Sequence, residues 1–259
     1  MSVFRKVAGV GVSLCTLLCA GSVSAQERGA DRHVALGDSA YALRNATEAL
    51  MHFLSAIASD SNSFEAQWKA SRTEVDLAEI APKGRMMDSL LTDAERHAGN
   101  AIRLRPDTAD GHFALARAVG RRALSVGTMD RIRYSKMVRA EALAALRHDS
   151  THAGALHVLG MWNAEIMRVN GLARRFARAF LGAGVFGLAS WDEAQRLLEL
   201  AVRVDQKRIV HRLDLAGIYA DRGDKESARA LYEWIAAAPV VEPNDDLYKR
   251  QAAARLERL

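Results

Sequence analysis

Short apolar motifs recur along the chain at a fixed offset. Each starts with an alanine and a larger apolar residue and ends in a polar, turn-forming pair; the four copies span residues 56–61, 101–106, 145–150 and 201–206. Nine residues beyond each copy lies a pair of apolar or small residues, at 70–71, 115–116, 159–160 and 215–216. This recurrence predicts an internal repeat, in which small residues let paired helices cross closely.

The offsets match those of the tetratricopeptide repeat, a helix–turn–helix unit of about 34 residues. The last copy is the clearest, with Leu215, Tyr219 and Ala228 on the repeat spacing and Gly223 at the turn between the helices. A glycine there supplies the positive φ that ends the first helix. The predicted repeat landmarks are Leu36, Gly37, Ala56, Ala101, Ala145, Leu159, Gly160, Trp162, Ala201, Leu215, Tyr219, Gly223 and Ala228.

We therefore predict an all-α fold, an α-solenoid of about five helix pairs with a C-terminal capping helix. The predicted repeat domain spans 26–259, with repeats near 30–63, 64–108, 109–152, 153–208 and 209–242 and a cap at 243–259. The second, third and fourth repeats are longer than the rest, and we expect their insertions between the two helices of each pair. The composition agrees, because 49% hydrophobic residues, 6% aromatic residues and four prolines favour helices over a β-sandwich or a disordered chain.

The first 25 residues form a segment of their own. Arg5 and Lys6 precede an uncharged run from 7 to 25 that ends in Val-Ser-Ala. This pattern predicts a cleavable secretory signal and a periplasmic or other extracytoplasmic location, with an uncleaved membrane anchor as the alternative. Both cysteines lie within this segment, so the remaining chain has neither disulfides nor a thiol nucleophile.

Basic residues gather in the middle of the chain. Between Arg117 and Arg178, twelve Lys and Arg stand against four Asp and Glu, while the segments before and after are slightly acidic. This pattern predicts a basic central groove that attracts an acidic protein or peptide, although arginines on solvated helix faces are an equally simple explanation. The candidate partner-binding residues are Arg117, Arg121, Arg122, Arg174, Arg175 and Arg178.

The insertion in the fourth repeat, residues 171–187, is basic and contains phenylalanines. On a helix Arg174, Arg175 and Arg178 share one side, and Phe176 and Phe180 another. A basic amphipathic helix of this kind is able to lie on an anionic membrane surface, which offers an alternative function. The competing explanation is that Phe176 and Phe180 pack the insertion onto the solenoid.

No motif points to catalysis. The chain lacks a phosphate-binding glycine loop, a nucleophile elbow and a zinc-protease motif. His148, His152 and His157 lie close in sequence, but their spacing does not bring three ligands together on one helix face, so we predict no metal site. We also predict no cofactor, no small-molecule substrate and no nucleic-acid partner.

The C-terminal half resembles a known family. A His-Val-Leu-Gly-Met-Trp helix start at 157–162, the basic insertion, Ser190-Trp-Asp-Glu and Pro239-Val-Val occur in the order found in the regulator of microtubule dynamics family. The resemblance covers residues 93–259 and implies a non-catalytic tetratricopeptide-like interaction protein. Animal members are associated with microtubules, mitochondria and membrane contacts. The export signal and the composition favour an exported bacterial relative, so we expect a scaffold for proteins or peptides without the microtubule role.

Overall fold

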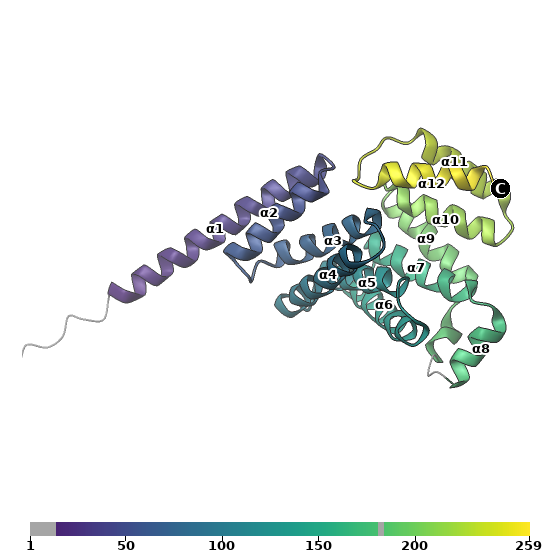
Figure 1. The fold of residues 1–259 in the computed structure, drawn as a ribbon, viewed down its shortest axis with the longest axis horizontal. Coiled ribbons are helices and arrows are strands. Elements are labelled where there is room, and N and C mark those ends of the chain that lie inside the picture. Colours follow the sequence, from purple (N-terminus) through teal and green to yellow (C-terminus); the bar gives the residue numbers. More distant parts are fainter. Residues whose placement is uncertain (1–13, 181–183) are drawn as a thin grey trace, which may run out of the picture.

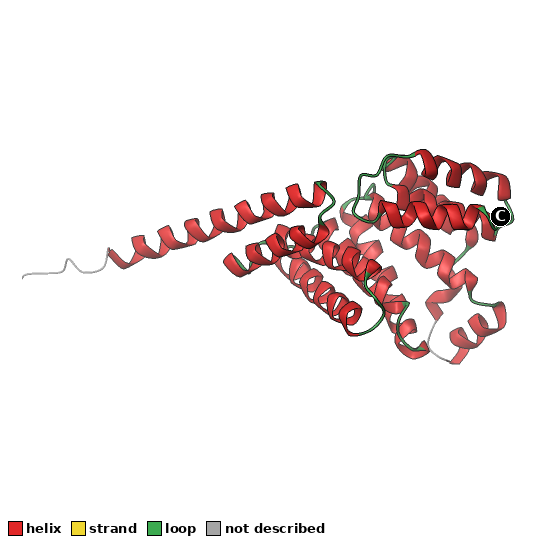
Figure 2. Ribbon diagram, turned by 45° about the horizontal axis from the view of Figure 1, so that its top comes forward, coloured by secondary structure: helices red, strands yellow, loops and turns green. Residues whose placement is uncertain are grey.

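The computed structural model describes residues 14–180 and 184–259, with side chains from residue 27 onward except those of Phe176, Arg178 and Phe180. Figure 2 shows that the described chain is helical, with short loops between the helices. The first helices of the five pairs are α1 (Leu14–Ala42), α3 (Phe64–Ile80), α5 (Ala109–Ala123), α7 (Ala153–Arg168) and α10 (Ile209–Asp221). The second helices are α2 (Ala46–Ser59), α4 (Arg85–Leu104), α6 (Thr128–His148), α9 (Trp191–Val204) and α11 (Lys225–Ala237).

The pairs stack on one another in chain order (Figure 1). Each first helix packs against its own second helix, and each second helix packs against the next pair. The last helix, α12 (Asp245–Leu256), covers α10 and α11. The predicted all-α solenoid with a capping helix is therefore confirmed.

The recurring motifs end the second helices in the same way. The residue four positions after each landmark alanine donates its N–H to that alanine's carbonyl, from Asp60 to Ala56 at 2.8 Å and from Asp149 to Ala145 at 2.9 Å. The carboxylate of Asp60 or Asp149 then accepts the N–H two residues further on, at 2.9 Å in both cases. An Asx turn of this kind stops the helix and directs the chain into the next pair.

Glycines allow close helix crossings inside two pairs. A Cβ on Gly37 of α1 would lie 2.5 Å from the ring of Phe53 in α2, which is fully buried. A Cβ on Gly160 of α7 would lie 3.0 Å from Leu198 in α9. At Gly223, the turn between α10 and α11, φ is +85°. Leu36 differs from the other apolar landmarks, because it is 40% exposed on a side of α1 that no described helix pair covers.

The insertion of the fourth pair lies between α7 and α9. It comprises α8 (Gly171–Phe180) and the 3-10 helix η1 (Gly184–Leu188). Phe186 of η1 is buried in a cluster with Trp162 and Ile166 of α7. The second and third repeats owe their length mainly to long second helices, since α4 has 20 residues and α6 has 21.

One histidine lies in the core without a hydrogen bond. His211 of α10 is 1% exposed, and neither ring nitrogen has a hydrogen-bond partner among the described residues. Burial, together with the nearby His157, Arg208 and Arg212, holds the pKa of His211 well below its usual value of 6.5. The folded protein therefore keeps this ring neutral.

Stability should fall as the solution becomes acidic. Because the folded-state pKa of His211 is depressed, its contribution is fully present above about pH 6.5 and is lost below it, at up to about 1.4 kcal/mol per pH unit. We expect His211→Phe to remove about 1 kcal/mol of the stability loss between about pH 7 and about pH 5.5, measured by urea unfolding. The exposed His148→Phe is the control, and an equal effect of both changes would contradict the assignment.

Candidate interaction groove

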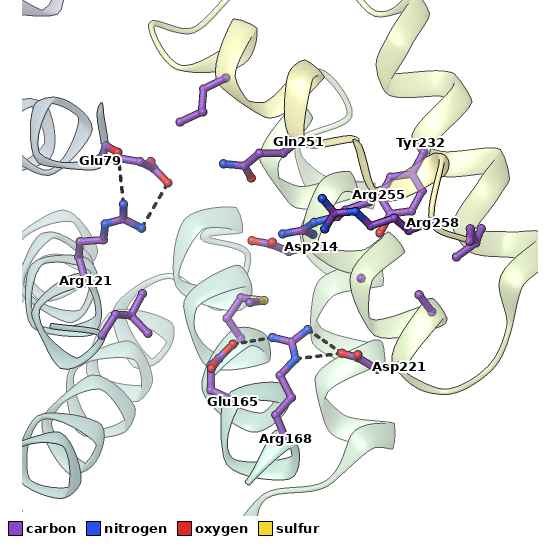
Figure 3. A pocket seen from close by; sticks show the side chains of 16 residues that line it. Glu79, Arg121, Glu165, Arg168, Asp214, Asp221, Tyr232, Gln251, Arg255 and Arg258 are labelled. Carbon is purple, nitrogen blue, oxygen red and sulfur yellow. Dashed lines mark hydrogen bonds and ion pairs between the residues drawn. The ribbon is translucent and has the colours of Figure 1, made fainter. Parts of the chain in front are cut away.

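A groove of about 700 Å³ lies between the first helices of four pairs and α12 (Figure 3). Helices α3, α5, α7 and α10 form one wall, and α12 forms the other. The charged lining residues are Glu79, Arg121, Glu165, Arg168, Asp214, Asp221, Arg255 and Arg258. The groove thus has a mixed charge, and its binding properties depend on which of these groups already have partners.

The groove wall formed by α12 consists of residues on one side of this helix. Leu247, Gln251 and Arg255 follow one another at spacings of four residues, which places them on one side of α12, and Arg258 follows in the turn just after the helix. The opposite side of α12 packs through Tyr248 and Ala252 into the core of the fifth pair. The C-terminal helix therefore covers the last repeat and also forms part of the groove.

Three of the predicted binding arginines connect neighbouring repeats. Arg117 of α5 contacts Asp76 of α3 at 2.6 Å. Arg121 contacts Glu79 of α3 at 3.5 Å. Arg122 binds the carboxylate of Glu95 and donates to the hydroxyl of Thr92 at 2.7 Å, both in α4. Of these three, only Arg121 lines the groove.

Asp76 is the centre of this set of contacts. Its carboxylate accepts the hydroxyl of Tyr41 in α1 at 2.8 Å and the guanidinium of Arg117 in α5, while its backbone carbonyl accepts the side-chain amide of Asn244 at 3.0 Å. Burial and then Asp76 raise the pKa of Tyr41, which keeps the phenol protonated as a donor. Burial disfavours the charge of Arg117, but Asp76 and nearby tyrosines outweigh it and raise the pKa of Arg117. The carboxylate of Asp76 thus joins three repeats, and the backbone of the same residue holds the C-terminal segment.

The acidic groups of the groove are already occupied. Glu79 accepts the hydroxyl of Tyr248 at 2.7 Å in addition to its contact with Arg121. Arg168 lies between Glu165 and Asp221, at 2.5 and 2.7 Å.

The fourth groove carboxylate also has a partner, since Asp214 pairs with His157 at 2.9 Å. Arg255 reaches only the carbonyl of Leu213, at 3.4 Å, and the phenol of Tyr232. Neither Arg255 nor Arg258 forms an ion pair with any described residue. The charges still available to a partner are therefore positive.

Gly217 of α10 makes room for these cations. A Cβ there would lie 3.3 Å from the guanidinium of Arg255 and 3.7 Å from that of Arg168. The two side chains cross the same stretch of α10 from opposite walls (Figure 3). A larger residue at position 217 would therefore occupy the space beside the guanidinium groups of Arg255 and Arg168.

Arg174 and Arg175 of the insertion do not line the groove. Arg174 donates to the carbonyls of Ile166 and Met167 at 3.3 Å and so caps the end of α7. Arg175 is exposed, and the side chains of Arg178, Phe176 and Phe180 lie outside the described residues. Among the described helices, none is both long and apolar enough to span a bilayer.

The three histidines have separate surroundings. His148 stacks on His112, with ring centroids 5.6 Å apart. The ring of His152 accepts the N–H of Ala155 at 3.1 Å and caps α7. His157 faces Asp214 in the groove wall. No group of three metal-ligating side chains occurs in the part of the chain that the structure describes.

Sequence reasoning missed the two arginines that remain free. We assigned residues 243–259 to a polar cap, although the 247–251–255–258 stripe is visible in the sequence. The stripe alone does not distinguish a groove wall from a solvated helix face, and the packing of Tyr248 decides the orientation.

Loss of the Asp76 charge should destabilise the fold. In Asp76→Asn, the Arg117 guanidinium stays largely buried without a counter-charge, and we expect the free energy of unfolding to fall by about 2–4 kcal/mol in urea titrations. The control is Asp93→Asn, which breaks the exposed pair with Arg96 and should cost less than about 1 kcal/mol. Similar losses in both variants would show that Asp76 is not a central contact.

Comparison with solved structures shows that tetratricopeptide-repeat proteins share this fold. Among solved structures the chain is similar to TTC0263, a thermophilic TPR protein of Thermus thermophilus, with 20% identity, a TM-score of 0.63, and coverage of 88% of this chain and 99% of that one. It is also similar to PilF of Pseudomonas aeruginosa, with 13% identity, a TM-score of 0.49 and 90% coverage of both chains. A comparison with curated proteins finds no significant match.

The match to a family model extends beyond the segment that carries the sequence resemblance. The model described as regulator of microtubule dynamics protein 1-3 matches residues 35–259, and so includes the first pairs as well as residues 93–259. This match covers most of the chain, and the protein therefore belongs to the regulator of microtubule dynamics protein 1-3 family.

Proposed function

We propose that the protein is a non-catalytic scaffold that binds a segment of a partner protein in the groove between α12 and the first helices of the pairs. The observation that carries the proposal is the groove itself, about 700 Å³ in volume with two unpaired arginines on one wall. A solenoid of helix pairs typically uses such an extended inner surface for binding. Tetratricopeptide-like family membership is consistent with this role.

The partner segment that fits this groove is acidic. The groove carboxylates are held by arginines, a tyrosine and a histidine, whereas Arg255 and Arg258 are available. An incoming carboxylate gains charge-assisted hydrogen bonds from these guanidinium groups. We therefore relocate the basic site from the central arginines to α12, because Arg117, Arg121 and Arg122 already hold the repeats together.

The same contacts support a non-catalytic role. An acid–base pair needs a titratable group that is free to exchange a proton with a substrate. Glu79, Glu165 and Asp221 are each engaged by a guanidinium. We infer that the groove recognises a ligand and does not transform it.

Export remains part of the proposal. Cleavage after Ala25 would divide α1, and the buried side chains of this helix that the structure describes lie beyond the cut. Among the described side chains of α1, the first buried one is Ala30, followed by Val34, Ala40 and Tyr41. The processed chain would therefore keep the contacts of α1 with α2 and α3.

Charge reversal at Arg255 and Arg258 should weaken the binding of acidic ligands. The probes are two fluorescent decapeptide pools, one rich in Asp and Glu and one with Lys in their place. We expect the acidic pool to bind more tightly, and Arg255→Glu/Arg258→Glu to weaken its binding at least about tenfold in fluorescence polarisation, since two charge-assisted contacts become repulsive.

The matched control is Arg229→Glu/Arg250→Glu. It changes the net charge equally at two arginines of α11 and α12 that do not line the groove. Equal binding of the two pools, or an equal loss in the control, would refute the acidic-ligand proposal.

Processing of the N-terminus has a direct test. When the full chain is expressed with its own first 25 residues in a bacterial secretion host, we expect intact-mass analysis to find a product that starts at Gln26. Replacing Ala25 by Arg should block cleavage, because the site requires a small residue. A secreted or membrane-bound wild-type product that retains residue 1 would contradict cleavage.

A further inference from the structure

The C-terminal helix is attached to the fifth pair by apolar packing and to the first two pairs by polar contacts, which include an exposed ion pair of Asp246 with Arg44 at 3.7 Å. On the fifth pair, Tyr248 and Ala252 join an apolar cluster with Ile209, Leu213 and Ile235. This cluster contains no residue of α1, α2, α3 or α4. Apolar burial therefore fixes α12 to the fifth pair alone.

The attachment to the second pair is polar. The amide of Asn244 donates to the backbone carbonyl of Asp76 at 3.0 Å and to the carboxylate of Glu79 at 3.3 Å. The hydroxyl of Tyr248 donates to the same carboxylate at 2.7 Å. We call these contacts between Asn244, Tyr248, Asp76 and Glu79 the latch. They join residues that lie 165 or more positions apart in the sequence.

The latch lies at one end of the groove. Glu79 is both a latch residue and a groove-lining residue, and it also meets Arg121 of α5 there (Figure 3). On the other wall, Leu247 and Gln251 line the groove on either side of Tyr248 in the sequence. A partner segment that occupies the groove therefore lies directly beside the latch.

The two attachments differ in what their separation requires. Hydrogen bonds that open to solvent are replaced by bonds to water, so their net cost is small. Separation of an apolar cluster exposes its whole surface to water. A solenoid also bends along its length, because each pair contacts only its neighbours. Opening is therefore easiest at the latch, with α12 remaining on the fifth pair.

We propose that the latch is the gate of the groove: the first two pairs, α1–α4, move away from α12 when it opens and close the groove when it re-forms. The proposal rests on the proposed function for its consequence, since the gate controls entry of the partner segment. The proposal also predicts that the distance between the first two pairs and the fifth pair changes when the latch is removed. This change does not depend on any partner.

The test measures that distance. Spin labels are attached to cysteines introduced at Leu43, which is 79% exposed between α1 and α2, and at the exposed Glu226 of α11. The full chain is used, with Cys15 and Cys19 replaced by serine. In double electron–electron resonance we expect one narrow distance population, and an added longer population in the latch variant Asn244→Ala/Tyr248→Phe.

The control variant is Tyr219→Phe. It removes a tyrosine–glutamate hydrogen bond of the same kind, 3.0 Å to Glu199, that lies away from the latch. Tyr248→Phe alone is a milder second variant that keeps Asn244 and should give a smaller longer-distance population, with helix content by circular dichroism unchanged. Distances in both latch variants that equal those of the wild type would overturn the proposal, as would an equal change in Tyr219→Phe.

Binding of the acidic decapeptide pool distinguishes failure of the latch proposal from failure of the acidic-ligand proposal. We expect the latch variants to associate with the pool several-fold faster than the wild type in stopped-flow fluorescence. A longer distance without any peptide binding supports the latch and counts against the acidic ligand. Peptide binding at wild-type rates with unchanged distances supports the ligand and overturns the latch.

Discussion

The arrangement of the repeats around the groove depends on the buried carboxylate of Asp76. It receives hydrogen bonds from Tyr41 of the first pair and Arg117 of the third, and the carbonyl of the same residue receives Asn244 from the C-terminal segment. A buried charge is stable only with well-placed partners, so these donors are held in fixed positions. The relative orientation of α1, α3 and α5 follows from that requirement.

Small residues set how closely the helices approach, and this spacing determines where Asp76 can act. Phe53 packs directly on Gly37, and Leu198 on Gly160, so each pair is drawn together at its crossing point. The α8–η1 insertion leaves the crossing of α7 and α9 intact because it lies in the connection between these two helices. Repeats of different length are therefore able to stack in one continuous solenoid.

The proposed binding of an acidic segment depends on the charged side chains that have no ion-pair partner. The number of charges in a stretch of sequence matters less. In the basic central segment, Arg117, Arg121 and Arg122 of α5 are engaged by carboxylates of the second pair. One side of α12 closes the apolar core of the fifth pair, and the other presents Arg255 to the groove, with Arg258 in the turn just after the helix. The capping helix that a solenoid needs has thereby become a wall of the candidate site.

The sequence by itself determined the helix pairs, because local signals carry them: an alanine at each crossing, an Asx or proline turn after each second helix, and Gly223 at its turn. It also determined the family, through motifs spread over the C-terminal half. The roles of the arginines were decided only by the tertiary structure. Arg117 and Arg122 meet carboxylates 41 and 27 residues away, and Tyr248 meets Glu79 across 169 residues. A helical period shows which side chains share a face, but whether that face meets a carboxylate or solvent depends on how the solenoid bends back on itself, which no local pattern encodes.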